Sequence, residues 1–130
     1  MKLACALFIA VFAGAAVADD AQTAETLAEV RDFEVASLDR QSIEARGDTV
    51  RFDVVVKWRD PAQRPPQAAA SRVIRYAAKC ADKTLGVVAA AALDQNGRLL
   101  KSYVIPPGGT DFLVPKEGSR ESEWFGQVCR

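Results

Sequence analysis

The chain has 130 residues with 17 basic and 17 acidic side chains, so its formal net charge at neutral pH is zero. This balance lacks the basic excess of nucleic-acid-binding proteins, and we expect no nucleic-acid partner. The chain has no histidine, which excludes Ser-His-Asp and Cys-His nucleophile systems and histidine-rich metal sites. Its carboxylates stand in no recognisable catalytic motif. We therefore predict a protein that is not an enzyme and uses no metal or cofactor.

The N-terminus has the three parts of a secretory signal peptide. Lys2 supplies a positive charge, residues 3–12 form an uncharged apolar run, and residues 16–18 (Ala-Val-Ala) offer small side chains for cleavage. We predict that residues 1–18 are removed and that the mature chain begins at Asp19. The apolar run is too short to cross a bilayer comfortably and no second run follows, so we expect no membrane span.

The cysteines indicate how the mature chain is stabilised. Removing residues 1–18 leaves 112 residues, enough for one domain with one core, and leaves only Cys80 and Cys129. Two cysteines in an exported protein usually pair, so we predict a Cys80–Cys129 disulfide. Its loop of 49 residues would contribute about 4 kcal/mol to stability. The alternative is a redox-active pair, but such pairs are normally close in sequence.

The first part of the mature chain is the least regular. Residues 19–32 are polar and rich in alanine, and they form either a short helix around residues 26–30 or a flexible lead-in. Residues 33–38 are predicted to be the first strand. A turn at residues 39–42 and a second turn at residues 46–48 would follow, which indicates the edges of a hairpin.

The clearest strand signal spans residues 49–59, where apolar side chains alternate strictly with mostly charged ones. Trp58 lies on the apolar side, and we interpret it as a core residue rather than a ligand-stacking one. Residues 60–70 contain three prolines and Arg64, a composition that predicts an extended, exposed loop. The loop is either a recognition element for a partner or a plain connection.

Two further strands are predicted from the middle of the chain. Residues 71–80 alternate again, which directs Cys80 inward. Residues 84–93 are apolar on both faces, so this strand should be central or covered. Its small side chains would accommodate the bulk of Trp124 and Phe125.

Turn signals delimit the last strand. Residues 94–97 (Asp-Gln-Asn-Gly) predict a tight primed hairpin turn, because Asn and Gly tolerate positive φ. Residues 99–105 would form the returning strand. The segment 106–109 (Pro-Pro-Gly-Gly) ends it, and we interpret these glycines as a turn rather than a phosphate-binding loop.

The C-terminal segment is predicted to be an amphipathic helix that begins after Ser119, with acidic residues in its first turn. Its apolar stripe consists of Trp124, Phe125, Val128 and Cys129. With Cys80 pointing inward from a strand, the disulfide would clamp this helix to the sheet. We therefore predict an α+β, mainly β fold: an antiparallel sheet of about five or six strands, with the C-terminal helix packed on one face and held by a disulfide.

Several short motifs occur in a characteristic order. They are the signal peptide, Leu38-Asp39-x-x-Ser42-Ile43, a valine-rich strand ending in Trp58, a mid-chain Cys80, the Asn96-Gly97 hairpin and a terminal Val128-Cys129. This order resembles the surface-adhesin protein E-like family of Gram-negative bacteria. The resemblance covers residues 33–130, which we predict to form a single domain. Residues 76–80 (Tyr-Ala-Ala-Lys-Cys) depart from the pattern, because relatives often carry an acidic residue just before the cysteine.

The resemblance implies an antiparallel sheet with a C-terminal helix held by a disulfide, in agreement with the periodicity. It also implies binding, because the characterised family adhesin binds host extracellular-matrix and serum proteins. Many relatives are small envelope proteins without an assigned activity. No segment of this chain matches a family binding motif, so no binding residue is carried over.

The leading hypothesis is a non-catalytic bacterial envelope protein that binds a protein or small apolar partner through the exposed sheet face or the proline-rich loop. The protein partner would be a host matrix or serum protein or an envelope protein. An alternative is a periplasmic accessory protein with an endogenous envelope partner, and a third is an enzyme of histidine-free chemistry. Export would place the chain in the periplasm or on the outer surface, and the edge strands would allow a homodimer.

Overall fold

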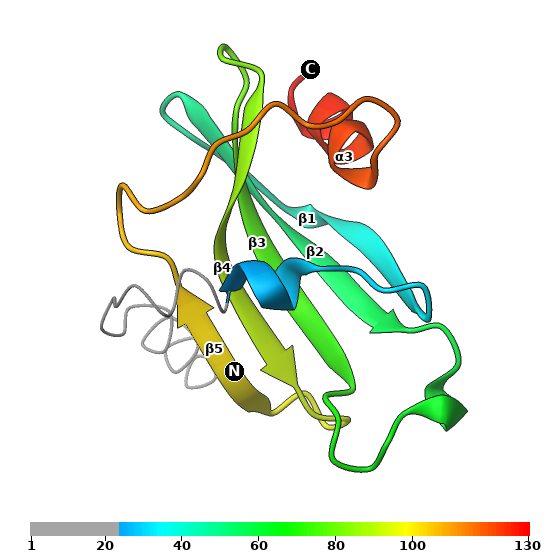
Figure 1. Ribbon diagram of the computed structural model, residues 1–130. Coiled ribbons are helices and arrows are strands. Elements are labelled where there is room, and N and C mark those ends of the chain that lie inside the picture. Colours follow the sequence, from blue (N-terminus) through cyan, green and yellow to red (C-terminus); the bar gives the residue numbers. More distant parts are fainter. Residues whose placement is uncertain (1–23) are drawn as a thin grey trace.

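The computed structural model describes residues 24–130, so the predicted signal peptide at 1–18 and residues 19–23 lie outside the described part. The described residues form one antiparallel sheet in which each strand pairs with the next along the chain (Figure 1). The elements are β1 (Glu34–Arg46), β2 (Thr49–Trp58), β3 (Ser71–Lys79), β4 (Thr84–Leu93), β5 (Leu99–Val104) and the helix α3 (Arg120–Val128). The predicted fold class is confirmed, with five strands in an open sheet.

The core follows from the period-two alternation of β2 and β3. Phe52 and Val54 of β2 are almost completely buried, as are Ile74 and Tyr76 of β3. Paired residues of neighbouring strands share a face, so Val54 lies opposite Ile74 and Phe52 lies opposite Tyr76. The rings of Phe52 and Tyr76 stack with centroids 5.4 Å apart. This face of the sheet, called here the covered face, carries the main core.

The first strand corrects one prediction. Residues 39–42 were expected to form a turn, but β1 runs through them and pairs with β2 on both sides of an irregularity between Asp39 and Glu44. The Ser42 hydroxyl donates to the Asp39 carbonyl and accepts from the Asp53 amide, so polar side chains replace the missing ladder bonds. The predicted turn at residues 46–48 is confirmed, with Gly47 at positive φ.

The hairpin between β4 and β5 is present, but its turn differs from the prediction. Asn96 does not adopt positive φ, and only Gly97 does, with φ 79°. The Gly97 amide donates to the Asp94 carbonyl, and the Asp94 amide donates to the Arg98 carbonyl. The Asp94 carboxylate also accepts from the Asn96 and Arg98 amides. The connection is therefore an ordinary β-turn followed by one left-handed glycine, which is longer than the predicted tight primed turn. The hydrogen bonds to the Asp94 carboxylate stabilise this longer connection.

The alternation of β4 is interrupted, which sequence periodicity did not show. Tyr76 pairs with Val87 whereas Arg75 pairs with Ala89, so Val88 is an extra residue in β4. As a result Val87 and Ala90 share the covered face. Ala90 packs against Ala24, while Trp124 packs with the cluster around Tyr76. The prediction that the small residues of this strand accommodate Trp124 and Phe125 is wrong for Ala90, because Ala90 packs against Ala24 instead.

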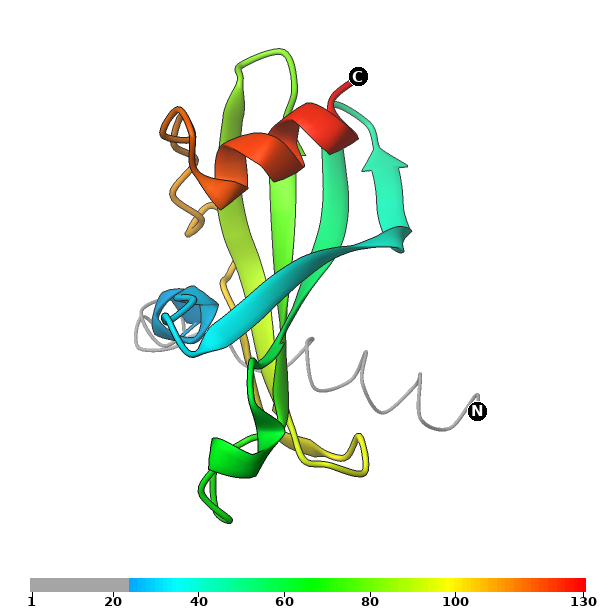
Figure 2. The same ribbon diagram turned by 90° about the vertical axis from the view of Figure 1, so that its right-hand side faces the viewer.

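Two helical segments pack on the covered face. Residues 24–28 are helical and contribute Ala24 and Leu27 to a small cluster with Ala90, so this helix begins and ends earlier than the range of residues 26–30 expected for it. The helix α3 begins after Ser119, as predicted, and packs through Trp124. From the side, α3 crosses the upper part of the sheet and the helix at residues 24–28 lies lower (Figure 2). No helix in residues 24–130 has the length and hydrophobicity needed to cross a bilayer.

Candidate functional site

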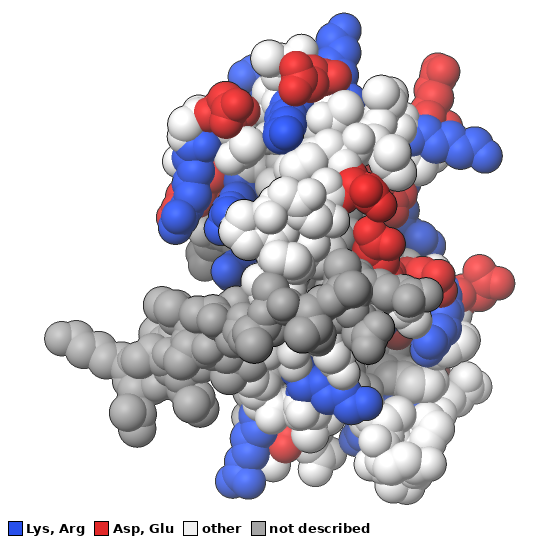
Figure 3. Space-filling view, turned by 60° about the vertical axis from the view of Figure 1, so that its left-hand side comes forward, with Lys and Arg blue, Asp and Glu red and all other residues white. Residues whose placement is uncertain are grey.

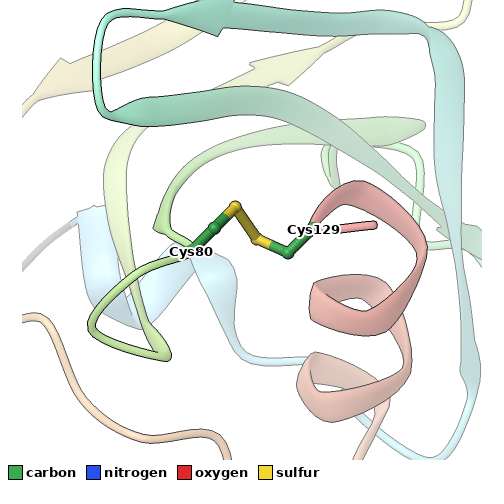
Figure 4. Close-up of a disulfide and its surroundings, with 2 residues drawn as sticks. All are labelled: Cys80 and Cys129. Carbon is green, nitrogen blue, oxygen red and sulfur yellow. A yellow bond between two sulfur atoms is a disulfide. The ribbon is translucent and has the colours of Figure 1, made fainter.

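The disulfide anchors the first wall of the candidate site. Cys80 directly follows β3 and Cys129 is the C-terminal cap of α3, and their Cα atoms lie 5.4 Å apart (Figure 4). The predicted Cys80–Cys129 bond is thus present, and it ties the end of α3 to the sheet. Trp124 then lies over Tyr76, with ring centroids 5.6 Å apart. This contact places the middle of α3 over β3.

An ion pair anchors the second wall. Arg72 projects from β3 onto the covered face, where its guanidinium lies 2.6 Å from a carboxylate oxygen of Glu34. Both side chains are nearly fully buried. The same guanidinium donates to the carbonyl of Leu27 and to that of Glu29, at 2.9 Å for the latter. Arg72 therefore binds the C-terminal carbonyls of the helix at residues 24–28, where cations are favoured, and holds this helix against the sheet.

The role of Arg72 was missed in the sequence, although a signal for it existed. Extending the period-two pattern of residues 71–80 back from Ile74 places Arg72 on the inward face. A buried arginine is uncommon, so one inward-facing arginine in a strand is only a weak signal for a buried ion pair. The partner, Glu34, is 38 residues away in the chain, and no local pattern connects the two.

The third wall is the segment that connects β5 to α3. Leu113 exchanges two backbone hydrogen bonds with Leu85 of β4, at 2.9 and 3.0 Å. A Cβ atom at Gly86 would lie 2.4 Å from the Thr110 side chain and 2.7 Å from the Asp111 carbonyl. Gly86 is therefore required for this segment to approach the sheet so closely.

These three walls enclose a groove of about 600 Å³. Its floor is formed by Tyr76, Leu85 and Val87, and its walls by residues 25–29, residues 111–116 and the first turn of α3. Burial raises the pKa of the Tyr76 phenol, and the nearby Glu121 raises that pKa further. The phenol therefore stays protonated at neutral pH and is a hydrogen-bond donor in the groove.

The rim of the groove is partly apolar and mostly acidic. Leu113 and Val114 are 68% and 72% exposed, the highest values among the large apolar residues of the described chain. The charged side chains that line the groove are Glu25, Glu29, Asp111, Glu121 and Lys116. In the space-filling view, Asp and Glu side chains gather to the right of a central uncharged surface (Figure 3).

The proline-rich loop does not have the predicted extended form. Residues Pro61–Gln63 form a 3₁₀ turn, and the Asp60 carboxylate caps it by accepting from the Ala62 amide. Arg64 folds back and donates to the Ala68 carbonyl at 2.8 Å. The loop is exposed but satisfies many of its own hydrogen bonds, because the Asp60 cap and Arg64 both act within it.

Trp58 is a boundary residue rather than a fully buried core residue. It is half-buried, its ring lies 4.8 Å from that of Phe33, and its indole N–H donates to the Ala69 carbonyl at 3.0 Å. Its indole therefore joins the proline-rich loop to the sheet. No ligand role is needed to explain its position.

The opposite face of the sheet, which the helix at 24–28 and α3 leave uncovered, is the other surface that the sequence suggested. Asp53 and Arg75 form a two-bond ion pair there, at 2.9 and 3.2 Å. Val35 is 45% exposed on the same face. Besides this charged pair, the face has a row of apolar residues, Val55, Val73 and Ala91, that are paired across neighbouring strands.

The structure brings together no metal-binding cluster of side chains in residues 24–130. No group of three or more Cys, Asp and Glu side chains in that range is arranged to hold a metal ion. The groove instead combines an apolar floor, exposed apolar residues and charges that form no ion pair within residues 24–130, an arrangement that suits binding.

The fold and site define a small, mainly β domain with a disulfide-anchored helix and a groove on its covered face. A family model for the surface-adhesin protein E family matches residues 26–130, and the chain belongs to that family. The resemblance inferred from sequence motifs is thereby confirmed. Membership supports a surface-adhesin-like, non-enzymatic role at the extracellular surface and binding to other proteins. Among curated proteins, no sequence matches the chain.

Proposed function

We propose that this protein is a non-catalytic envelope protein that is exported by its signal peptide and binds a protein partner through the groove. The observation that carries the proposal is the exposed pair Leu113 and Val114 beside the apolar floor. Exposed apolar residues that continue into a hollow are typical of protein-binding surfaces. Family membership supports the same role.

Capture of partners by the immobilised, oxidised protein tests the proposal. Leu113→Asp places a charge at the groove and is expected to abolish capture of a specific protein from matrix, serum or envelope extracts. Val35→Asp makes the same change on the uncovered face and is the matched control. If Val35→Asp abolishes capture and Leu113→Asp does not, the uncovered sheet face is the binding surface and the proposal is wrong.

The location of the protein decides which partners it can meet. Protease treatment of intact cells should cleave the tagged protein if it is on the outer surface, and host matrix or serum proteins are then the expected partners. Protection until the outer membrane is permeabilised would place it in the periplasm. In that case the partner would be an endogenous envelope protein, as in the alternative of an accessory role.

A further inference from the structure

The charges on the groove are strongly one-sided in a chain whose net charge is zero. Four carboxylates line it, and Lys116 is its only cationic lining residue within residues 24–130. None of the four forms an ion pair with another residue in that range. Unpaired carboxylates around an apolar floor attract a cationic ligand that also has apolar parts.

The size and floor of the groove limit what this ligand can be. About 600 Å³ is the volume of a typical ligand pocket, and its floor offers Leu85 and Val87 to apolar side chains. The Tyr76 hydroxyl lines the groove and forms no hydrogen bond with any residue between 24 and 130, so its donor is available to a ligand carbonyl. A peptide segment supplies all three features: apolar side chains, cationic side chains and carbonyl groups.

From these observations we propose that the groove binds a cationic, apolar peptide segment of a partner protein. Apolar side chains of that segment fill the floor, and its Lys or Arg side chains face Glu29 and Glu121. This inference rests on the proposed function, because it specifies the chemistry of the partner at the same groove. The chain's own residues 19–23 do not fit this description, since they carry two Asp and no Lys or Arg.

Synthetic peptides of equal length test the inference on the purified, oxidised protein. The probe alternates Lys and Val, one comparison peptide alternates Glu and Val, and another alternates Lys and Ser. Fluorescence anisotropy at low salt should give an affinity for the Lys-Val peptide about tenfold or more above that for either comparison peptide. Only the Lys-Val peptide has both apolar side chains for the floor and cationic side chains for the acidic rim. Added salt should weaken its binding.

Variants of the rim locate the binding. Glu29→Gln combined with Glu121→Gln should weaken binding of the Lys-Val peptide about tenfold, because two favourable charge interactions are removed without a change of shape. Asp48→Asn removes an exposed carboxylate in the β1–β2 turn, outside the groove, and should leave the affinity unchanged. Circular dichroism of each variant checks that the fold is retained.

Several outcomes would overturn the inference. Equal affinity for the Glu-Val peptide would show that the rim charges do not select the ligand, and equal affinity for the Lys-Ser peptide would show that the floor does not. An equal effect of Asp48→Asn would place binding elsewhere. If self-association of the protein is lost in Leu113→Asp, a second copy occupies the groove instead. Each of these results leaves the proposed function standing so long as Leu113→Asp still abolishes partner capture.

Discussion

The helix α3 and the helix at residues 24–28 pack on the same face of one sheet, yet different chemistry holds them. The helix α3 inserts Trp124 against Tyr76 and is closed by the Cys80–Cys129 bond. The helix at residues 24–28 packs Ala24 and Leu27 beside Ala90 of β4 and is held by the buried guanidinium of Arg72. A covalent bond and an ion pair thus position opposite walls of the same groove.

Because their anchors differ, the two walls should be loosened by different changes. The disulfide is sensitive to redox conditions, whereas the Arg72 anchor depends on the pairing of a buried charge. We therefore expect reduction to loosen the wall formed by α3 and loss of the Arg72 charge to loosen the wall formed by the helix at residues 24–28.

The largest effect is expected from removing the disulfide. Replacement of both Cys80 and Cys129 by Ser should lower the free energy of unfolding by about 4 kcal/mol, because the loop of 49 residues is no longer closed in the unfolded chain. Denaturant unfolding of the oxidised parent and the double variant measures the difference. A loss below about 1 kcal/mol would contradict a main role for this bond.

A somewhat smaller loss is expected at the other wall. Arg72→Met should lower the free energy of unfolding by about 3 kcal/mol, because the buried Glu34 carboxylate loses its ionic partner but keeps a hydrogen bond from the Arg31 amide. Arg75→Met breaks a more exposed ion pair in the same strand and is the matched control, with an expected loss of about 1 kcal/mol or less. Equal losses would mean that burial of the Arg72 pair is not what matters.

Between the two walls, Tyr76 should make stability dependent on alkaline pH. Tyrosine in an unfolded chain has a pKa of about 10. In the folded protein the pKa of Tyr76 is raised above this value. The stability that the protonated Tyr76 phenol contributes is therefore complete below a pH of about 10 and is lost as the pH rises from there toward the raised pKa. Tyr76→Phe should reduce the alkaline loss by up to about 1.4 kcal/mol per pH unit in unfolding measurements. The same reduction in Tyr103→Phe would contradict the assignment to Tyr76.

The smallest effect concerns the beginning of α3, which borders the groove. Ser119 caps the helix by accepting from the Ser122 amide at 3.1 Å. Ser119→Ala should lower the free energy of unfolding by about 1 kcal/mol. Ser119→Asp retains a capping oxygen and should therefore keep most of the stability that the cap contributes. Thermal unfolding followed by circular dichroism measures both. Equal stability of the Ala and Asp variants would show that this cap is not needed once the disulfide holds the other end.

Most of the strands were predictable because their patterns are local. The alternation of β2 reflects burial of one face, and residues 84–93 were predicted with the bounds that β4 has in the structure. The bulges in β1 and β4 were not predictable, because the same residues are compatible with an unbroken strand or a turn. Their position depends on partners across the sheet, such as Asp53 for Ser42.

The candidate site was much less predictable than the fold. The sequence suggested the exposed face of the sheet and the proline-rich loop as binding surfaces, whereas the groove lies on the covered face. Glu29, Tyr76, Leu113 and Glu121 are far apart in the chain and carry no shared motif, so only packing brings them together.

By itself, the sequence determined the mainly β class, the helix after Ser119 and the pairing of Cys80 with Cys129, because alternation, capping and cysteine count are properties of short segments or of composition. Tertiary structure alone decided that Arg72 would hold the helix at residues 24–28 and that residues 111–116 would lie against β4 beside Gly86. Those contacts join segments distant in the chain, and their stability comes from burial and hydrogen bonds that exist only after the sheet has formed.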